Sequence, residues 1–170
     1  MLVIVCILAT IFTVSCGKQG TKNGRFLSEW PLHLRATVNF DSKEYEIDIS
    51  MEDKNDISIT FSAPEVLKNT VLRMKNGECF MEYMSVEIPI TDGGYSADNG
   101  LLLIRHILSL TADDYLKADA VKESGIKYYV EHYKTNFGNV SVYYIADANV
   151  PSKVQAALNG HSVILTIVNE

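Results

Sequence analysis

The chain has 170 residues, with 15 basic and 21 acidic side chains and a formal net charge of −6 at pH 7. An acidic chain without a basic patch argues against nucleic acid as a partner. Its three cysteines, Cys6, Cys16 and Cys79, are too few for a disulfide framework, since two of them lie in a leading apolar segment.

That leading segment, LVIVCILATIFTV, occupies residues 2–14 and carries no charge. It is shorter than the roughly 20 apolar residues that a membrane-spanning helix needs, and it fits the apolar region of a secretory signal. Ser15, Cys16 and Gly17 follow it. A small residue directly before a cysteine at this place resembles the lipobox of bacterial lipoproteins. The resemblance implies that residues 1–15 are a signal peptide and that Cys16 becomes the N-terminus, with a diacylglycerol on its thiol.

Residues 16–25 predict a flexible tether, because they contain three glycines and no large apolar side chain. Lys18, Lys22 and Arg25 would lie near anionic lipid head groups, and basic residues together with acyl chains give stable membrane binding. We therefore expect a lipid-anchored protein on the extracytoplasmic face of a bacterial cell membrane. An ordinary signal peptide with an incidental cysteine is the alternative. Residues 26–170 are enough for a single domain.

The first part of the domain predicts an antiparallel meander. Apolar side chains occupy every second position of LHLRATVNF, at residues 32–40, and the same alternation returns in residues 43–50 and 57–61. Only one face of each strand is apolar, so one face of the sheet covers a core. Asn76-Gly77 then predicts a hairpin turn between arms at residues 71–75 and 78–88.

A helix is predicted over residues 100–111, GLLLIRHILSLT, with its apolar side chains gathered on one side. Residues 111–118 predict a further turn or short helix after it. Strands return in residues 127–134 and 139–147, a proline-started helical turn is expected in residues 150–160, and a last strand in residues 161–168. The predicted fold is α+β and mainly β: a curved antiparallel sheet, as in an unfinished barrel, with a central apolar helix covering its concave face.

This order of elements resembles the lipoprotein-carrier fold of the LolA and LolB type. The resemblance rests on the opening meander from LRATVNF to ISITF, on FSAPEVLKN, and on the ending ANVPSKVQAALNGHSVILTIVN. It implies a groove between sheet and helix that takes an acyl chain or another apolar ligand, in a membrane-tethered binder. The residues expected to line that groove are Val38, Ile49, Phe61, Leu103, Ile104, Ile107 and Leu108. The alternative is a structural or protein-interaction module whose core is filled and binds no ligand.

No constellation of residues predicts an enzyme. The chain has no Gly-rich phosphate loop, GxSxG or HExxH, and its four histidines lack metal-ligand spacing. We therefore expect no catalytic residue, no metal and no cofactor, and no protein partner can be named. Cys79 is expected to be a small buried hydrophobe. In the two tyrosine pairs, residues 128–129 and 143–144, strand alternation places one member inside and one outside.

Overall fold

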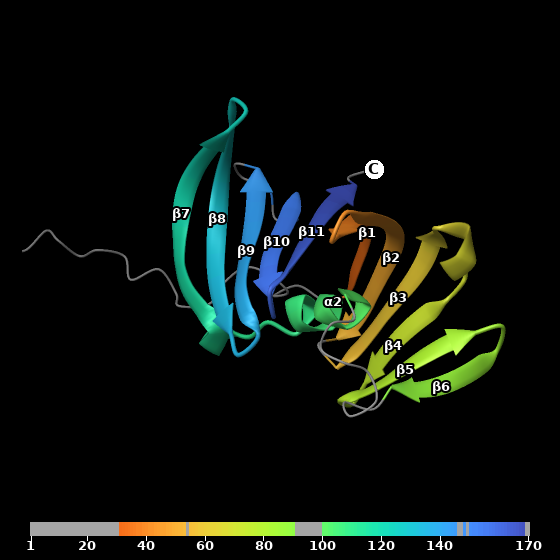
Figure 1. Ribbon diagram of the computed structural model, residues 1–170. Coiled ribbons are helices and arrows are strands. Elements are labelled where there is room, and N and C mark those ends of the chain that lie inside the picture. The colour runs from red at the N-terminus through yellow and green to blue at the C-terminus, as the bar shows by residue number, and fades with distance from the viewer. Residues whose placement is uncertain (1–30, 54, 91–99, 146–147, 149, 169–170) are drawn as a thin grey trace, which may run out of the picture.

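The computed structural model describes residues 31–53, 55–90, 100–145, 148 and 150–168 (Figure 1). The predicted signal peptide, Cys16 and the tether lie outside these residues. The strands are β1 Leu32–Phe40, β2 Lys43–Asp53, β3 Asp56–Ala63, β4 Val71–Lys75, β5 Glu78–Tyr83, β6 Val86–Ile90, β7 Tyr115–Glu123, β8 Ile126–Thr135, β9 Gly138–Ile145, β10 Lys153–Leu158 and β11 His161–Val168. The helical elements are η1 Glu65–Leu67, α2 Gly100–Leu108 and η2 Ala112–Asp114.

All eleven strands form one antiparallel sheet in the order β6-β5-β4-β3-β2-β1-β11-β10-β9-β8-β7. The first and last strands pair in the middle of the sheet, with Val38 opposite Leu165. The sheet does not close, so β6 and β7 form its two edges. Figure 1 shows it strongly curved, with α2 lying against the central strands inside the curve. The prediction of a mainly β chain with an unclosed antiparallel sheet is confirmed.

The core lies on one face of this sheet, as the alternating pattern predicts. In β1 to β3 the buried positions alternate with exposed or half-buried ones, and the buried side chains join a single cluster. The same cluster contains inward residues of β9, β10 and β11, for example Val142, Val154 and Leu165. The two halves of the chain therefore share one core across the β1–β11 pairing.

The helix is shorter than predicted. It has nine residues and ends at Leu108, after which Ser109 closes the last turn with a hydrogen bond from its backbone N–H to the Arg105 carbonyl. Nine residues of α-helix span about 13 Å, whereas eleven strands lie about 4.8 Å apart. A helix of this length covers only part of the concave face.

The prediction of a helical turn in residues 150–160 is wrong, because Lys153–Leu158 forms strand β10. Ala, Gln and Leu favour a helix, but this segment pairs with β9 on one side and β11 on the other. Val154, Ala156 and Leu158 are buried at every second position. Pairing with two neighbours thus overrides a weak helical propensity.

Two other boundaries differ from the prediction. Residues 78–88 are not one arm, since a turn at Met84-Ser85 separates β5 from β6. In residues 111–118 only Ala112–Asp114 is helical, and β7 begins at Tyr115. Thr111 and Asp114 form a capping box around this short 3-10 turn. The box explains the acidic pair that the sequence shows there, since Asp114 accepts the Thr111 backbone N–H at 2.8 Å.

Candidate functional site

The seven residues predicted to line a groove are all buried. Val38, Ile49, Phe61, Leu103, Ile104, Ile107 and Leu108 are each no more than 2% exposed and belong to the same cluster. The helix side chains therefore pack directly on the strands. Contact of these residues with a ligand stays a prediction.

A second part of the concave face, on the β5–β6 hairpin, is apolar but exposed. Leu72 of β4 is buried in the core and lies opposite Met81, so Met81 points to the concave side. Alternation and the β5–β6 register extend this row to Tyr83, Val86, Ile88 and Ile90. We name these five residues, Met81, Tyr83, Val86, Ile88 and Ile90, the apolar shelf.

The apolar shelf is the part of this face that the core leaves open. Tyr83 is 40% exposed, Val86 59% and Ile88 40%, while Met81 and Ile90 are half-buried. Four residues of strand separate Val86 from Ile90, a length of about 13 Å. The sequence points to this row through the alternating apolar residues of VEIPI, but the unrecognised turn at Met84-Ser85 hid it.

The free edge beside the apolar shelf is poorly suited to adding another strand. Met84 and Ser85 have φ values of 49° and 65°, so they form a type I′ turn whose flanking pair is Tyr83 and Val86. In such a hairpin the flanking pair is hydrogen-bonded and the pairs alternate, which turns the backbone of Glu87 and Pro89 toward the free edge. Pro89 has no N–H to donate there. Recognition at this hairpin is therefore expected through side chains.

A pocket of about 300 Å³ lies where the apolar shelf meets α2. It is lined by Gly77, Glu78, Cys79, Phe80, Pro89, Ile90 and Arg105. Ile90 belongs to the shelf, and Cys79, which lies opposite it, is buried as the sequence predicts. Arg105 brings a guanidinium group from the half-buried side of the helix to this end of the shelf.

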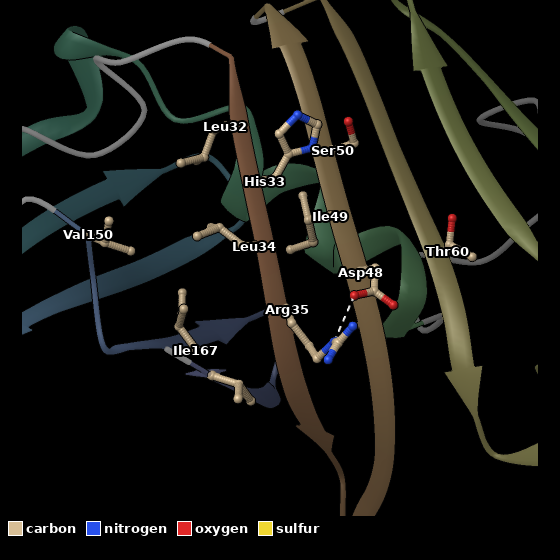
Figure 2. A pocket seen from close by; sticks show the side chains of 11 residues that line it. Leu32, His33, Leu34, Arg35, Asp48, Ile49, Ser50, Thr60, Val150 and Ile167 are labelled. Atoms are coloured by element: carbon tan, nitrogen blue, oxygen red, sulfur yellow. Dashed lines mark hydrogen bonds and ion pairs between the residues drawn. The ribbon is translucent and has the colours of Figure 1, made fainter. Parts of the chain in front are cut away.

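A larger recess of about 470 Å³ lies at the start of β1 (Figure 2). Pairing with β11 ends at Arg35, which lies opposite Val168, so the first residues of β1 extend past β11. Figure 2 shows Leu32 and Leu34 on the side of β1 that faces Val150. On the other side the Arg35 Nε lies 3.0 Å from the Asp48 carboxylate. The recess is thus divided between an apolar side and an ion pair.

The β7 to β9 half of the concave face holds a buried carboxylate among tyrosines. Glu131 is 1% exposed, and its Oε2 accepts hydrogen bonds from the hydroxyls of Tyr133 at 2.7 Å and Tyr144 at 3.5 Å. The Tyr115 ring packs edge-on against Tyr133 at 5.7 Å between centroids. A buried charge needs such partners, and this half of the face is filled by them. Sequence alternation places Glu131 inward but does not predict its partners.

These surroundings predict a pH effect on stability. Burial, and then the neighbouring Tyr129 and Glu131, raise the pKa of Tyr115 above its ordinary value of 10.0. The folded state thus holds the phenolic proton more tightly, and this contribution is present below about pH 10 and is lost as the pH rises through the folded pKa. Tyr115→Phe is expected to reduce the alkaline fall in the free energy of unfolding. Urea unfolding of both chains between about pH 8 and about pH 11 measures it, and equal slopes would contradict it.

Three polar side chains meet on the convex face of β7, β8 and β9. Ser141 Oγ lies 3.0 Å from His132 Nδ1, and His132 Nε2 lies 3.3 Å from Asp119 Oδ2. A hydrogen bond from Lys117 is the largest cause of the lowered pKa of Asp119. Because Ser141 has β8 and β10 on either side, the backbone N–H groups around it belong to the ladder and leave no oxyanion donors beside it among the described residues. The group links three strands.

The tyrosine pairs follow the predicted alternation. Tyr144 belongs to the core and Tyr129 packs against it, whereas Tyr128 and Tyr143 lie on the other face. Tyr143 is nevertheless only 9% exposed, because Lys153 Nζ lies 4.0 Å from its ring centroid and the Tyr128 ring packs edge-on at 5.8 Å. Among the described residues no group of three His, Cys, Asp or Glu side chains is placed to hold a metal ion.

Within the described part of the chain, none of the helices has the length and apolar character that crossing a bilayer requires. No protein-family model and no curated protein matches this chain.

Several solved structures are similar to it. One is a LolA superfamily protein from Nitrosomonas europaea, with 11% identity, coverage of 82% of this chain and 84% of that one, and a TM-score of 0.44. A second is an uncharacterised conserved protein from Thermus thermophilus, with 14% identity, coverage of 85% and 80%, and a TM-score of 0.49. A third is the Mycobacterium tuberculosis lipoprotein LppX, with 8% identity, coverage of 82% and 86%, and a TM-score of 0.41. The resemblance to lipoprotein carriers is confirmed to the extent that such proteins are among the structures to which this chain is similar.

Proposed function

We propose that this protein is a lipid-anchored binder of an apolar ligand, which lies on the concave face of the sheet along the apolar shelf. The observation that carries the proposal is the exposure of Tyr83, Val86 and Ile88 on a face whose other apolar side chains are buried. Apolar surface of this kind, bordered by polar groups, is typical of a ligand or interaction site.

The position of α2 supports this place for the ligand. We propose that the helix covers the central strands of the concave face, where Ile104 and Ile107 are 0% exposed. His106, on its other side, stacks on Phe137 of the β8–β9 turn with ring centroids 3.7 Å apart. A helix held on both sides leaves the shelf, rather than the space beneath the helix, as the open part of the groove.

Ile88→Ser is expected to weaken the binding of a neutral apolar probe by about tenfold, because it removes about two methylene equivalents of contact. The full chain carrying Cys16→Ser, expressed without lipid, is titrated with N-phenylnaphthylamine and followed by fluorescence. Ile126→Ser is the matched control, since Ile126 is 44% exposed against 40% for Ile88 but lies on the convex face of β8.

The proposal fails if the chain carrying only Cys16→Ser does not bind the probe, or if both isoleucine variants weaken binding equally. The filled packing of Leu103, Ile104 and Leu108 suits the second candidate, an interaction module without a ligand. That candidate predicts no saturable uptake of the probe, together with loss of a protein partner in the Ile88→Ser variant.

A further inference from the structure

Resting on the proposed function, we infer that the ligand is an anionic amphiphile, whose charged head lies in the pocket beside Arg105 and whose chain lies along the apolar shelf. The inference joins two features that α2 brings together. One is a row of apolar side chains on the β5–β6 hairpin, and the other is a cation at one end of that row.

The register places the cation at one end of the shelf. Val86 and Tyr83 flank the hairpin turn, and the row then runs through Ile88 to Ile90. Ile90 lines the pocket of about 300 Å³ together with Arg105. A linear molecule with one polar end therefore fits in one direction, with its head beside α2 and its chain toward the turn.

Charge complementarity favours an anion for that head. Of the residues that line the pocket in the described structure, Arg105 alone is positively charged, and Glu78 alone is negatively charged. Arg105 also interacts within the protein. A guanidinium group has five N–H donors in a planar fork, so it can keep one partner and still bind a carboxylate or phosphate with the others.

The decisive experiment compares heads on one chain length. Binding of oleate, of oleoyl lysophosphatidate and of neutral oleyl alcohol to the full chain carrying Cys16→Ser is measured by displacement of N-phenylnaphthylamine. Arg105→Gln is expected to weaken oleate and lysophosphatidate by about tenfold and to leave the alcohol unchanged. Arg105→Lys should restore part of the loss. The matched control is Arg73→Gln, since Arg73 lies on β4 in the same part of the sheet but is paired with Glu82 at 3.2 Å.

The two anions separate the possible sources of the head group. A larger loss for lysophosphatidate supports a phospholipid, and a larger loss for oleate supports a free fatty acid. Equal binding of oleate and the alcohol, with no effect of Arg105→Gln, overturns the inference and leaves the proposed function standing. Binding of none of the three molecules overturns both.

A second measurement covers the case in which Arg105→Gln does not fold. Added salt screens an exposed ion pair but not apolar contact, so the affinity of the unsubstituted Arg105 chain for oleate should fall as sodium chloride rises. Its affinity for oleyl alcohol should not fall. Parallel salt responses of the two ligands would also overturn the inference.

Discussion

Replacing Gly138 with alanine should destabilise the protein by about 3 kcal/mol or more, or abolish folding. Gly138 begins β9 with φ at +147°, a conformation that side chains rarely adopt. A β-carbon at this position would overlap the backbone carbonyl oxygen of Ala157, and it would lie 3.1 Å from the α-carbon of Leu158. These are backbone atoms of the neighbouring strand β10, so the overlap cannot be relieved by rotating a side chain.

The matched control is Gly77→Ala. Gly77 has φ at +86° in the β4–β5 turn, and a β-carbon there would have no atom within 4 Å. This variant should lose only the backbone preference, about 1–2 kcal/mol. Urea unfolding of both variants measures the difference. Equal losses would contradict the close approach of β9 and β10.

The second large effect concerns membrane attachment. Cys16→Ser should move nearly all of the protein from the membrane fraction to the soluble fraction, or leave the signal peptide uncleaved, because serine cannot carry the thioether-linked lipid. Fractionation and the intact mass of the protein measure it. The mass should also lack the diacylglycerol.

Cys6→Ser is the control for this experiment, since Cys6 lies in the segment that is expected to be removed. It should change neither the location nor the mass of the mature protein. Unchanged membrane retention and mass in the Cys16→Ser chain would refute the lipid anchor, and the ordinary signal peptide would then be the better interpretation.

Period-two alternation was enough to predict most of the sheet. It places Val38, Ile49 and Phe61 on one face, and all three are buried there. The pattern works because only one face of each strand covers the core, so a shift by one residue would expose the whole row. The Asn76-Gly77 turn was readable for the same local reason, since both residues adopt positive φ.

Elements that depend on neighbours distant in the sequence were not readable. Strand β10 has helix-forming residues and is held in place by β9 and β11. Met84-Ser85 adopts a turn that usually favours Asn and Gly, so the sequence does not mark where β6 begins. For the same reason the apolar shelf was missed, since its two strands had to be separated before Val86 and Ile88 could be placed on the concave face.

The polar groups were hidden for a similar reason. Arg105 belongs to a predicted helix, but its position beside Ile90 follows from how α2 packs in the curved sheet. Glu131 is predicted to point inward, yet its hydrogen bond to Tyr144 joins residues of two strands whose register the sequence does not state. Side-chain chemistry was readable, and its placement required the sheet.

The most direct test of the account is to map the bound chain. A fatty acid with a photoreactive group at its methyl end is bound to the full chain carrying Cys16→Ser, irradiated, and located by peptide mass spectrometry. The account predicts labelling of the β5–β6 hairpin, at residues 81–88, and competition by unlabelled oleate. Labelling confined to the convex face of the sheet, or labelling that oleate does not reduce, would contradict it.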